Sequence, residues 1–196
     1  MFNIKNSQKG FSLIELLVAT AIFTIVMTVA VGSLITMIDA NRKAQALKSV
    51  MNNLNFALEG MVRSARVGST YHCENDMSPS GVDSPSDCSS GGVLFAFEAY
   101  GGNRSDPSDQ IIYRFNSGNN QLERSTNGGA DFIAVTAPEV TIENMRFYVI
   151  GAVPLTGGDD RQPRVVITIR GRAGQTEKTE TTFELQGMAS QRVFDI

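Results

Sequence analysis

Glu15 is the residue whose type and position most constrain the chemistry of this chain. It stands directly before an uncharged apolar run from Leu16 to Ile38, which contains no Lys, Arg, Asp, Glu or Pro. An ionised carboxylate inside a membrane helix costs on the order of 2.5–3.5 kcal/mol on insertion scales, and it usually has a partner. We therefore expect Glu15 to pair with a group of opposite charge.

Helix capping offers a second interpretation of the same residues. Ser12 and Glu15 have the spacing of a capping box, with Ser12 as the N-cap and Glu15 as the third helical residue. Phe11 and Leu16 would then occupy the positions of a hydrophobic staple. Capping alone does not explain the short basic leader, the small Gly10 at the boundary or the long apolar run behind the cap.

Cys73 and Cys88 are the two cysteines of the chain, and they lie close together in a polar, loop-like stretch. In an exported protein this spacing favours one disulfide, which would stabilise the fold by roughly 3 kcal/mol. Two free thiols, or a metal pair completed by His72, are the alternatives. The metal alternative lacks a fourth ligand and the usual spacing of zinc-binding cysteines, so we expect no metal site there.

Catalytic chemistry is not indicated by the sequence. His72 is the single histidine, so a Ser-His-Asp site would have to use it, and no serine lies in a nucleophile-elbow motif. We expect neither enzymatic activity nor a cofactor.

Two groups of acidic residues are candidate calcium ligands, because calcium takes several oxygen ligands. These groups are Asp159 with Asp160, and Asp106 with Asp109. Arg161 directly follows the first pair, and neither group has a regular ligand spacing. A solvated turn is therefore the favoured interpretation, with calcium binding as the alternative.

The apolar run must form the element that carries Glu15. As an α-helix, residues 16–38 would be about 34 Å long, enough to span a bilayer core of roughly 30 Å. Small or hydroxylated residues recur every four positions and would form one stripe, which suits close helix packing in lipid. The alternative is that the threonines return their hydroxyls to backbone carbonyls. The stripe comprises Thr20, Thr24, Thr28, Gly32 and Thr36.

An amphipathic pattern follows the apolar run. Apolar residues recur three or four apart, which predicts a helix with one buried face. Because no proline occurs between residues 12 and 66, we expect one nearly continuous helix of about 55 residues. A coiled coil is a weaker alternative than packing against a sheet. The apolar positions are Ala44, Leu47, Met51, Leu54, Leu58, Met61 and Ala65.

The segment from Lys9 to Ala19 resembles the class III leader of type IV pilins and type II secretion pseudopilins. This resemblance implies that prepilin peptidase cleaves between Gly10 and Phe11 on the cytoplasmic side, and that Phe11 is then N-methylated. It also implies that the carboxylate of Glu15 attracts the new terminal amine of a neighbouring subunit during assembly. Two charges that are each costly in lipid would offset one another in that pair.

The same resemblance implies the partners and the location of the chain. The partners would be other pilins or pseudopilins through the N-terminal helix, prepilin peptidase and the inner-membrane assembly platform. The protein would cross the inner membrane once, with its C-terminal part on the periplasmic side, and would enter a fibre in the periplasm or at the cell surface. Basic residues flank the apolar run on both sides and do not decide the orientation.

The pattern beyond the helix predicts a loop and then a β-domain, which gives an α+β, pilin-like fold. We divide the chain into a cleaved leader (1–10), a helix (11–66, membrane-spanning over about 11–38), a variable loop with the disulfide (67–92) and an antiparallel β-domain (93–196). Alternating residues bounded by Gly-rich and Asn-rich turns predict the strands. They are Val93–Tyr100, Gln110–Asn116, Gln121–Ser125, Phe132–Thr136, Val140–Ile150, Arg164–Arg172 and Glu180–Ala189.

The net charge of the chain and the pattern of its strands restrict the classes of function that we expect. Loss of Lys5 and Lys9 with the leader lowers the basic count from 17 to 15 against 20 acidic residues, a net charge of −5. This balance argues against nucleic-acid binding. The strand region resembles the minor pseudopilin J and minor pilin W group, which implies a low-abundance subunit that initiates or caps the fibre. A tip-located binding module, an adhesin or a DNA-uptake receptor, is the alternative.

Overall fold

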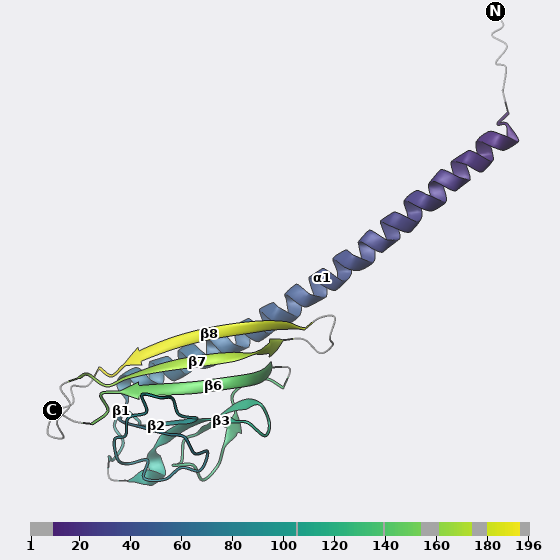
Figure 1. The fold of residues 1–196 in the computed structure, drawn as a ribbon. Helices are drawn as coiled ribbons and strands as arrows, with labels where there is room; N and C mark the ends of the chain where they lie inside the picture. The colour runs from purple at the N-terminus through teal and green to yellow at the C-terminus, as the bar shows by residue number, and fades with distance from the viewer. Residues whose placement is uncertain (1–9, 105, 139, 154–160, 174–179, 193–196) are drawn as a thin grey trace, which may run out of the picture. The chain divides into compact units, whose positions relative to one another are not determined.

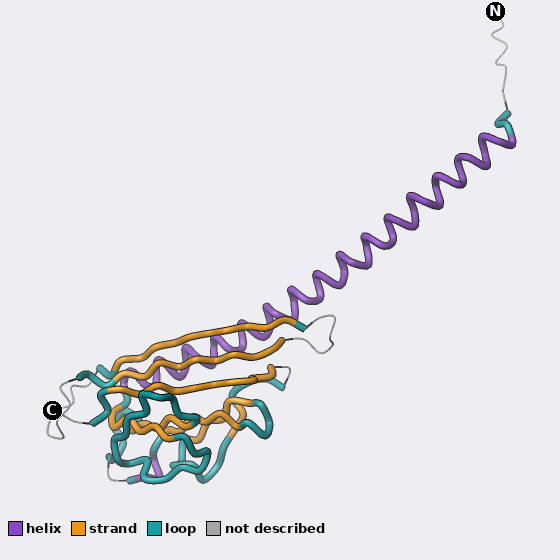
Figure 2. Tube along the Cα trace, in the orientation of Figure 1, coloured by secondary structure: helices purple, strands orange, loops and turns teal. Residues whose placement is uncertain are grey.

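The structure is a computed structural model that describes residues 10–104, 106–138, 140–153, 161–173 and 180–192. One long helix precedes two antiparallel sheets, so the predicted α+β class is confirmed (Figures 1 and 2). Contacts divide the chain into two units, one up to Arg42 and one from Lys43 onward. The residues of the leader before Gly10 and the pair Asp159–Asp160 lie outside the described residues.

Helix α1 spans Leu13–Val67, 55 residues, within two residues of the predicted bounds of 11–66 at each end. The backbone oxygen of Ser12 accepts the amide of Leu16 at 3.2 Å, which makes Ser12 the N-cap. In the first unit, threonine hydroxyls return to backbone carbonyls three or four residues earlier, at 2.8–3.0 Å. Each threonine of the stripe is therefore satisfied within its own helix, while a role of the stripe in helix packing stays a prediction.

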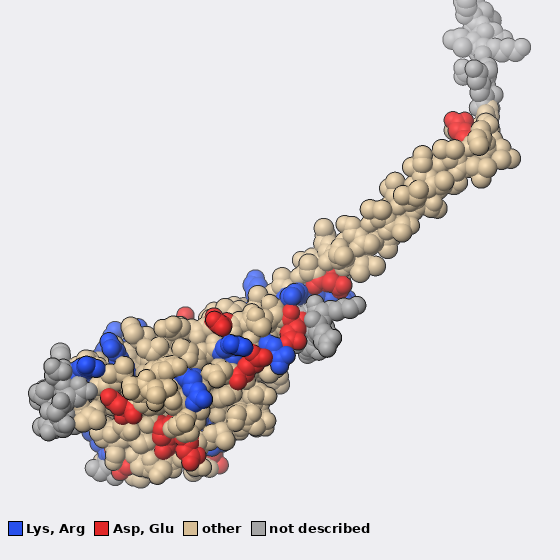
Figure 3. Space-filling model, viewed as in Figure 1, with Lys and Arg blue, Asp and Glu red and all other residues tan. Residues whose placement is uncertain are grey.

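By length and composition, α1 contains a stretch that could cross a membrane. Its large apolar side chains up to Ile38 are exposed. In Figure 3, the surface of this half of the helix shows no Lys or Arg, and its acidic atoms lie at its start.

In the second unit, α1 buries one face against the sheets. The predicted positions Leu54, Leu58, Met61 and Ala65 are buried, whereas Leu47 and Met51 are half-buried and Ala44 is exposed. Val50, four residues before Leu54, takes the place expected for Met51 because residues four apart share a helix face. The amphipathic pattern therefore predicted the correct face, except at its beginning.

The first sheet has five strands in chain order, each antiparallel to the next. They are β1 (Ser69–Glu74), β2 (Leu94–Glu98), β3 (Ile111–Asn116), β4 (Gln121–Ser125) and β5 (Ile133–Ala134), with a short 3-10 helix, η1 (Pro107–Asp109), between β2 and β3. The second sheet contains β6 (Val140–Ile150), β7 (Arg164–Ala173) and β8 (Thr181–Ser190), also antiparallel.

Strand β1 corrects the prediction of an unbroken loop over residues 67–92. Its polar residues resemble loop sequence, but Tyr71 is fully buried and packs edge-on against Phe95, with ring centroids 5.2 Å apart. The Tyr71 hydroxyl donates to the carbonyl of Ala65 at 2.7 Å. One buried aromatic therefore ties the end of α1 to the first sheet.

Both sheets and the second half of α1 contribute to one hydrophobic core. Phe95 stacks on Phe147 of β6 with ring centroids 5.8 Å apart, which joins the two sheets. Strand β8 has Gly187 where the helix approaches it, since a Cβ there would lie 2.9 Å from Leu58 Cδ1. The helix therefore packs closely against β8 because Gly187 has no side chain.

Leu54→Ala tests this packing. Leu54 is fully buried, so the substitution leaves a cavity and should lower the free energy of unfolding by about 2–5 kcal/mol. Thermal and urea unfolding of the detergent-solubilised full chain, followed by circular dichroism, measures the change. Asn55→Ala, on the exposed side of the same turn, should change it by less than about 0.5 kcal/mol. Equal losses in the two variants would contradict the assigned face.

Candidate functional site

The peptide bond between Gly10 and Phe11 lies in a non-helical, exposed segment just before α1. Phe11 is 82% exposed, and a Cβ on Gly10 would meet no atom within 4 Å. The segment is therefore non-helical and accessible, which suits a bond that a peptidase cleaves. A larger residue at position 10 would meet no obstacle from the described chain, so any requirement for glycine must come from another molecule.

Glu15 lies in the first turn of α1, as the third residue after the N-cap Ser12. The backbone geometry of a capping box is therefore present. Among the residues that the structure describes, however, the Glu15 carboxylate has no hydrogen-bond or ion-pair partner. Its position near the positive end of the helix dipole favours the charge by about 0.3–1 kcal/mol. That is less than the cost of placing a carboxylate in a membrane helix, so capping does not supply the expected partner.

The comparisons with known proteins match the same segment. The family model described as the prokaryotic N-terminal methylation motif matches residues 5–31, which include Gly10, Phe11 and Glu15. This motif is the signature of type IV pilins, so the N-terminal segment of the chain is pilin-like. No curated protein and no solved structure matches the chain.

The motif supports three coarse properties of this pilin-like chain. It is a substrate of the prepilin peptidase type, it is anchored in a membrane by the apolar half of α1, and it assembles with other pilins. The individual roles of Gly10, Phe11 and Glu15 stay predictions.

The predicted disulfide between Cys73 and Cys88 is present, with Cα atoms 5.6 Å apart. Cys73 lies on β1, and the amide of Cys88 donates to the carbonyl of Val149 on β6 at 3.0 Å. Gly92 and Phe147 exchange backbone hydrogen bonds of 2.8 and 2.9 Å. The disulfide therefore fixes the segment that connects β1 of one sheet to β6 of the other, and the two cysteines are not free to bind a metal.

His72 is held by backbone and has no catalytic partner nearby in the described chain. Its Nδ1 lies 2.7 Å from the carbonyl oxygen of Ser84, so Nδ1 carries the proton that is donated to this oxygen. Its Nε2 lies 3.8 Å from the carboxylate of Glu74. These contacts indicate that His72 positions the loop containing Ser84 against β1.

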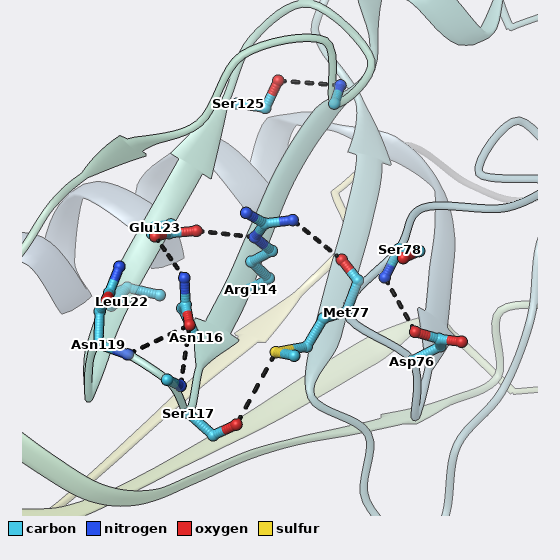
Figure 4. A network of polar contacts seen from close by, with 12 residues as sticks. Asp76, Met77, Ser78, Arg114, Asn116, Ser117, Asn119, Leu122, Glu123 and Ser125 are labelled. Atoms are coloured by element: carbon cyan, nitrogen blue, oxygen red, sulfur yellow. Dashed lines mark hydrogen bonds and ion pairs between the residues drawn. The ribbon is translucent and has the colours of Figure 1, made fainter.

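The polar segment after β1 is fixed to the first sheet by a network of hydrogen bonds (Figure 4). Arg114 donates to the carbonyl of Met77 at 3.1 Å and to the carboxylate of Glu123 at 2.8 Å. Asn116 donates to the second oxygen of the same carboxylate at 2.8 Å. The guanidinium of Arg114 also lies 3.5 Å from the ring centroid of Phe132. Arg114 therefore holds part of the predicted variable loop against β3 and β4.

A buried carboxylate that sequence reasoning missed lies beside the candidate calcium ligands. Glu98, at the end of β2, is 2% exposed and accepts from Gln110 Nε2 at 2.7 Å. A Cβ on Gly102 would collide with Glu98 Oε1 and would lie 3.1 Å from Asp109 Oδ2, so glycine permits this loop to approach both acids. Burial raises the pKa of Glu98, and the negative charges of Asp109 and Asp106 raise it further.

Hydrogen bonds within the loop hold Asp106 and Asp109, and calcium binding there stays the untested alternative. The Asp106 carboxylate accepts from the amide and hydroxyl of Ser108 at 2.9 and 2.6 Å, and Asp109 accepts from the amide of Asn103 at 2.9 Å. Among the described residues, no group of three or more His, Cys, Asp or Glu side chains is placed to hold a metal ion. One oxygen of Asp106 and one of Asp109 accept from the protein's own donors, whereas Asp109 Oδ1 and Glu98 Oε1 have no hydrogen-bond partner in the described part of the chain.

Removal of the disulfide tests its structural role. Cys73→Ala combined with Cys88→Ala should lower the free energy of unfolding by about 2–4 kcal/mol, because the unfolded chain gains the freedom of an open loop. Thermal unfolding of the full chain in detergent measures the loss. Reduction of the wild-type protein by dithiothreitol should cause a loss of similar size, and unchanged stability in both cases would contradict this role.

Proposed function

We propose that this protein is a minor pilin or pseudopilin. On this proposal it crosses the inner membrane once, with its β-sheets on the periplasmic side. It enters a type IV pilus or a type II secretion pseudopilus after cleavage between Gly10 and Phe11. The observation that carries the proposal is the match to the N-terminal methylation motif, together with a Glu15 carboxylate that has no partner in the described chain.

Cleavage would supply the missing partner. Hydrolysis of the Gly10–Phe11 bond creates a protonated amine on Phe11, and N-methylation leaves that nitrogen basic. A positive charge at the head of one apolar helix and the Glu15 carboxylate of an adjacent helix each cost free energy in lipid. When the two groups pair, each offsets the cost of the other, so an added subunit is retained.

The remainder of the chain supports an exported domain. A disulfide persists in oxidising compartments, so the Cys73–Cys88 bond supports a location of these cysteines outside the cytoplasm. The resemblance of the strand region to the minor pseudopilin J and minor pilin W group supports a position at the start or the tip of the fibre. We also propose that the protein acts without catalysis and without a cofactor, since its single histidine holds a loop in place.

A tip-located DNA receptor is the less favoured role. The segment from Val67 to Gly92 contains no Lys or Arg and has four acidic residues, Glu74, Asp76, Asp83 and Asp87. Binding to single strands uses a basic groove with aromatic platforms. This segment would repel a phosphate backbone.

Glu15→Val tests the pairing role. The variant should insert in the membrane and be cleaved normally, because valine favours an apolar helix, but its amount in purified fibres should fall by about tenfold or more. Immunoblots of membrane and fibre fractions from the native host measure both quantities. Ser33→Val, in the same apolar run but outside the stripe of small residues, is the matched control and should enter fibres normally. Wild-type incorporation of the Glu15 variant would remove the role that we assign to this carboxylate.

A further inference from the structure

The exposed face of α1 in the second unit carries a large apolar side chain. Phe56 is 83% exposed, and it lies on the face opposite the buried residues Leu54, Leu58 and Met61. Gly60 follows one turn later, with no atom within 4 Å of the position of a Cβ. This face therefore has a protruding aromatic ring at Phe56 and an open backbone position at Gly60.

The cavity that continues this face is lined by basic residues. It has a volume of about 520 Å³ and is lined by Glu59, Val62, Arg63, Arg66, Val67 and Arg192. Arg192 reaches it from the chain after β8, because its amide donates to the carbonyl of Arg66 at 2.9 Å. Three guanidinium groups thus share the cavity with one carboxylate.

These arginines differ from those elsewhere in the described chain. Arg172 pairs with Glu143 and Glu180 on the three-stranded sheet, where charges of both signs mix in Figure 3. The described residues give no ion pair to Arg63, Arg66 or Arg192. The helix dipole accounts for a basic residue in the last turn, which explains Arg66 alone. Arg63 and Arg192 add like charge beside the single carboxylate of Glu59, and no acid of the described residues lies within ion-pair distance of either.

The combination of residues indicates a protein interface. Single exposed apolar residues are common on protein surfaces. Phe56 differs because it is followed by the open backbone position at Gly60 and then by three guanidinium groups that have no ion pair among the described residues. Aromatic and arginine side chains are the types enriched at binding hot spots. A carboxylate from a partner would satisfy the arginines while apolar atoms beside it cover Phe56.

We propose that Phe56, Gly60, Arg63, Arg66 and Arg192 form a docking face for an acidic segment of a neighbouring pilin-type subunit. The inference rests on the proposed function and names a second contact, separate from Glu15. The mature chain carries a net charge of −5 once Lys5 and Lys9 are removed from 17 basic against 20 acidic residues. Within this acidic chain the three arginines form a local basic site, and guanidinium groups pair with carboxylates in a bidentate geometry, which favours a protein carboxylate as the occupant.

Photo-crosslinking in the native host tests the proposal. A benzophenone amino acid in place of Phe56 of the full-length chain should form an adduct with a processed pilin-type subunit, and mass spectrometry should map it within a few residues of an Asp or Glu. The same amino acid at Thr182, exposed on β8, is the control and should give at least fivefold less of that adduct. An adduct only with a non-pilin protein, or with a pilin segment that lacks acids, would overturn the proposal.

Charge reversal tests the role of the arginines. Arg63→Glu combined with Arg66→Glu should reduce the adduct at position 56 by at least fivefold, whereas Arg63→Lys with Arg66→Lys should retain most of it. Arg164→Glu with Arg170→Glu makes the same change in net charge on the exposed face of β7 and should have no effect on the yield. Equal yields in both reversed variants, with unchanged melting temperatures, would show that these arginines do not contact the partner.

Failure of this inference is distinguishable from failure of the proposed function. If wild-type protein is absent from fibres, the proposed function fails and the docking face fails with it. If wild-type protein enters fibres in a Glu15-dependent way but gives no adduct from position 56, the docking face alone is overturned.

Discussion

A carboxylate and an amine that are each unfavourable in lipid become tolerable when they pair, and the organisation of this chain follows from that constraint. Glu15 lies at the head of an apolar helix, and the described residues provide it with no partner. The amine on Phe11 does not exist until the leader is removed. On our proposal, processing therefore creates the charge that assembly requires, and an uncleaved subunit cannot form the pair.

The two halves of α1 suit two different environments, an apolar one for the first half and the core of the sheets for the second. Before Arg42 the side chains of α1 are exposed and apolar, and the threonine hydroxyls bond within the helix. After Lys43 the helix buries a stripe centred on Leu54 and Leu58 in the core of the sheets. Tyr71 and Gly187 hold that second half against β1 and β8. The disulfide and the Phe95–Phe147 contact then join the two sheets.

Local patterns could be predicted from sequence because their causes are local. The ends of α1, the bounds of β4 and β6 and the Cys73–Cys88 pair all follow from periodicity, turn residues or spacing. Strand β1 was missed because its polar residues lie beside a cysteine loop, and its burial depends on Phe95 far along the chain. The burial of Glu98 and the approach of Arg192 to Arg66 depend on sheet pairing, and no short window of sequence contains them. The candidate assembly site was predictable because Gly10, Phe11 and Glu15 occupy one short motif.

The central claim is that a new amine on Phe11 meets Glu15, and the native N-terminus tests it most directly. Intact-mass and N-terminal peptide mass spectrometry should be performed on the protein isolated from membranes and from fibres of its own host. The account predicts that the chain begins at Phe11 and carries one added methyl group on its terminal nitrogen. A chain that retains Met1, or that begins at any residue other than Phe11, would contradict it.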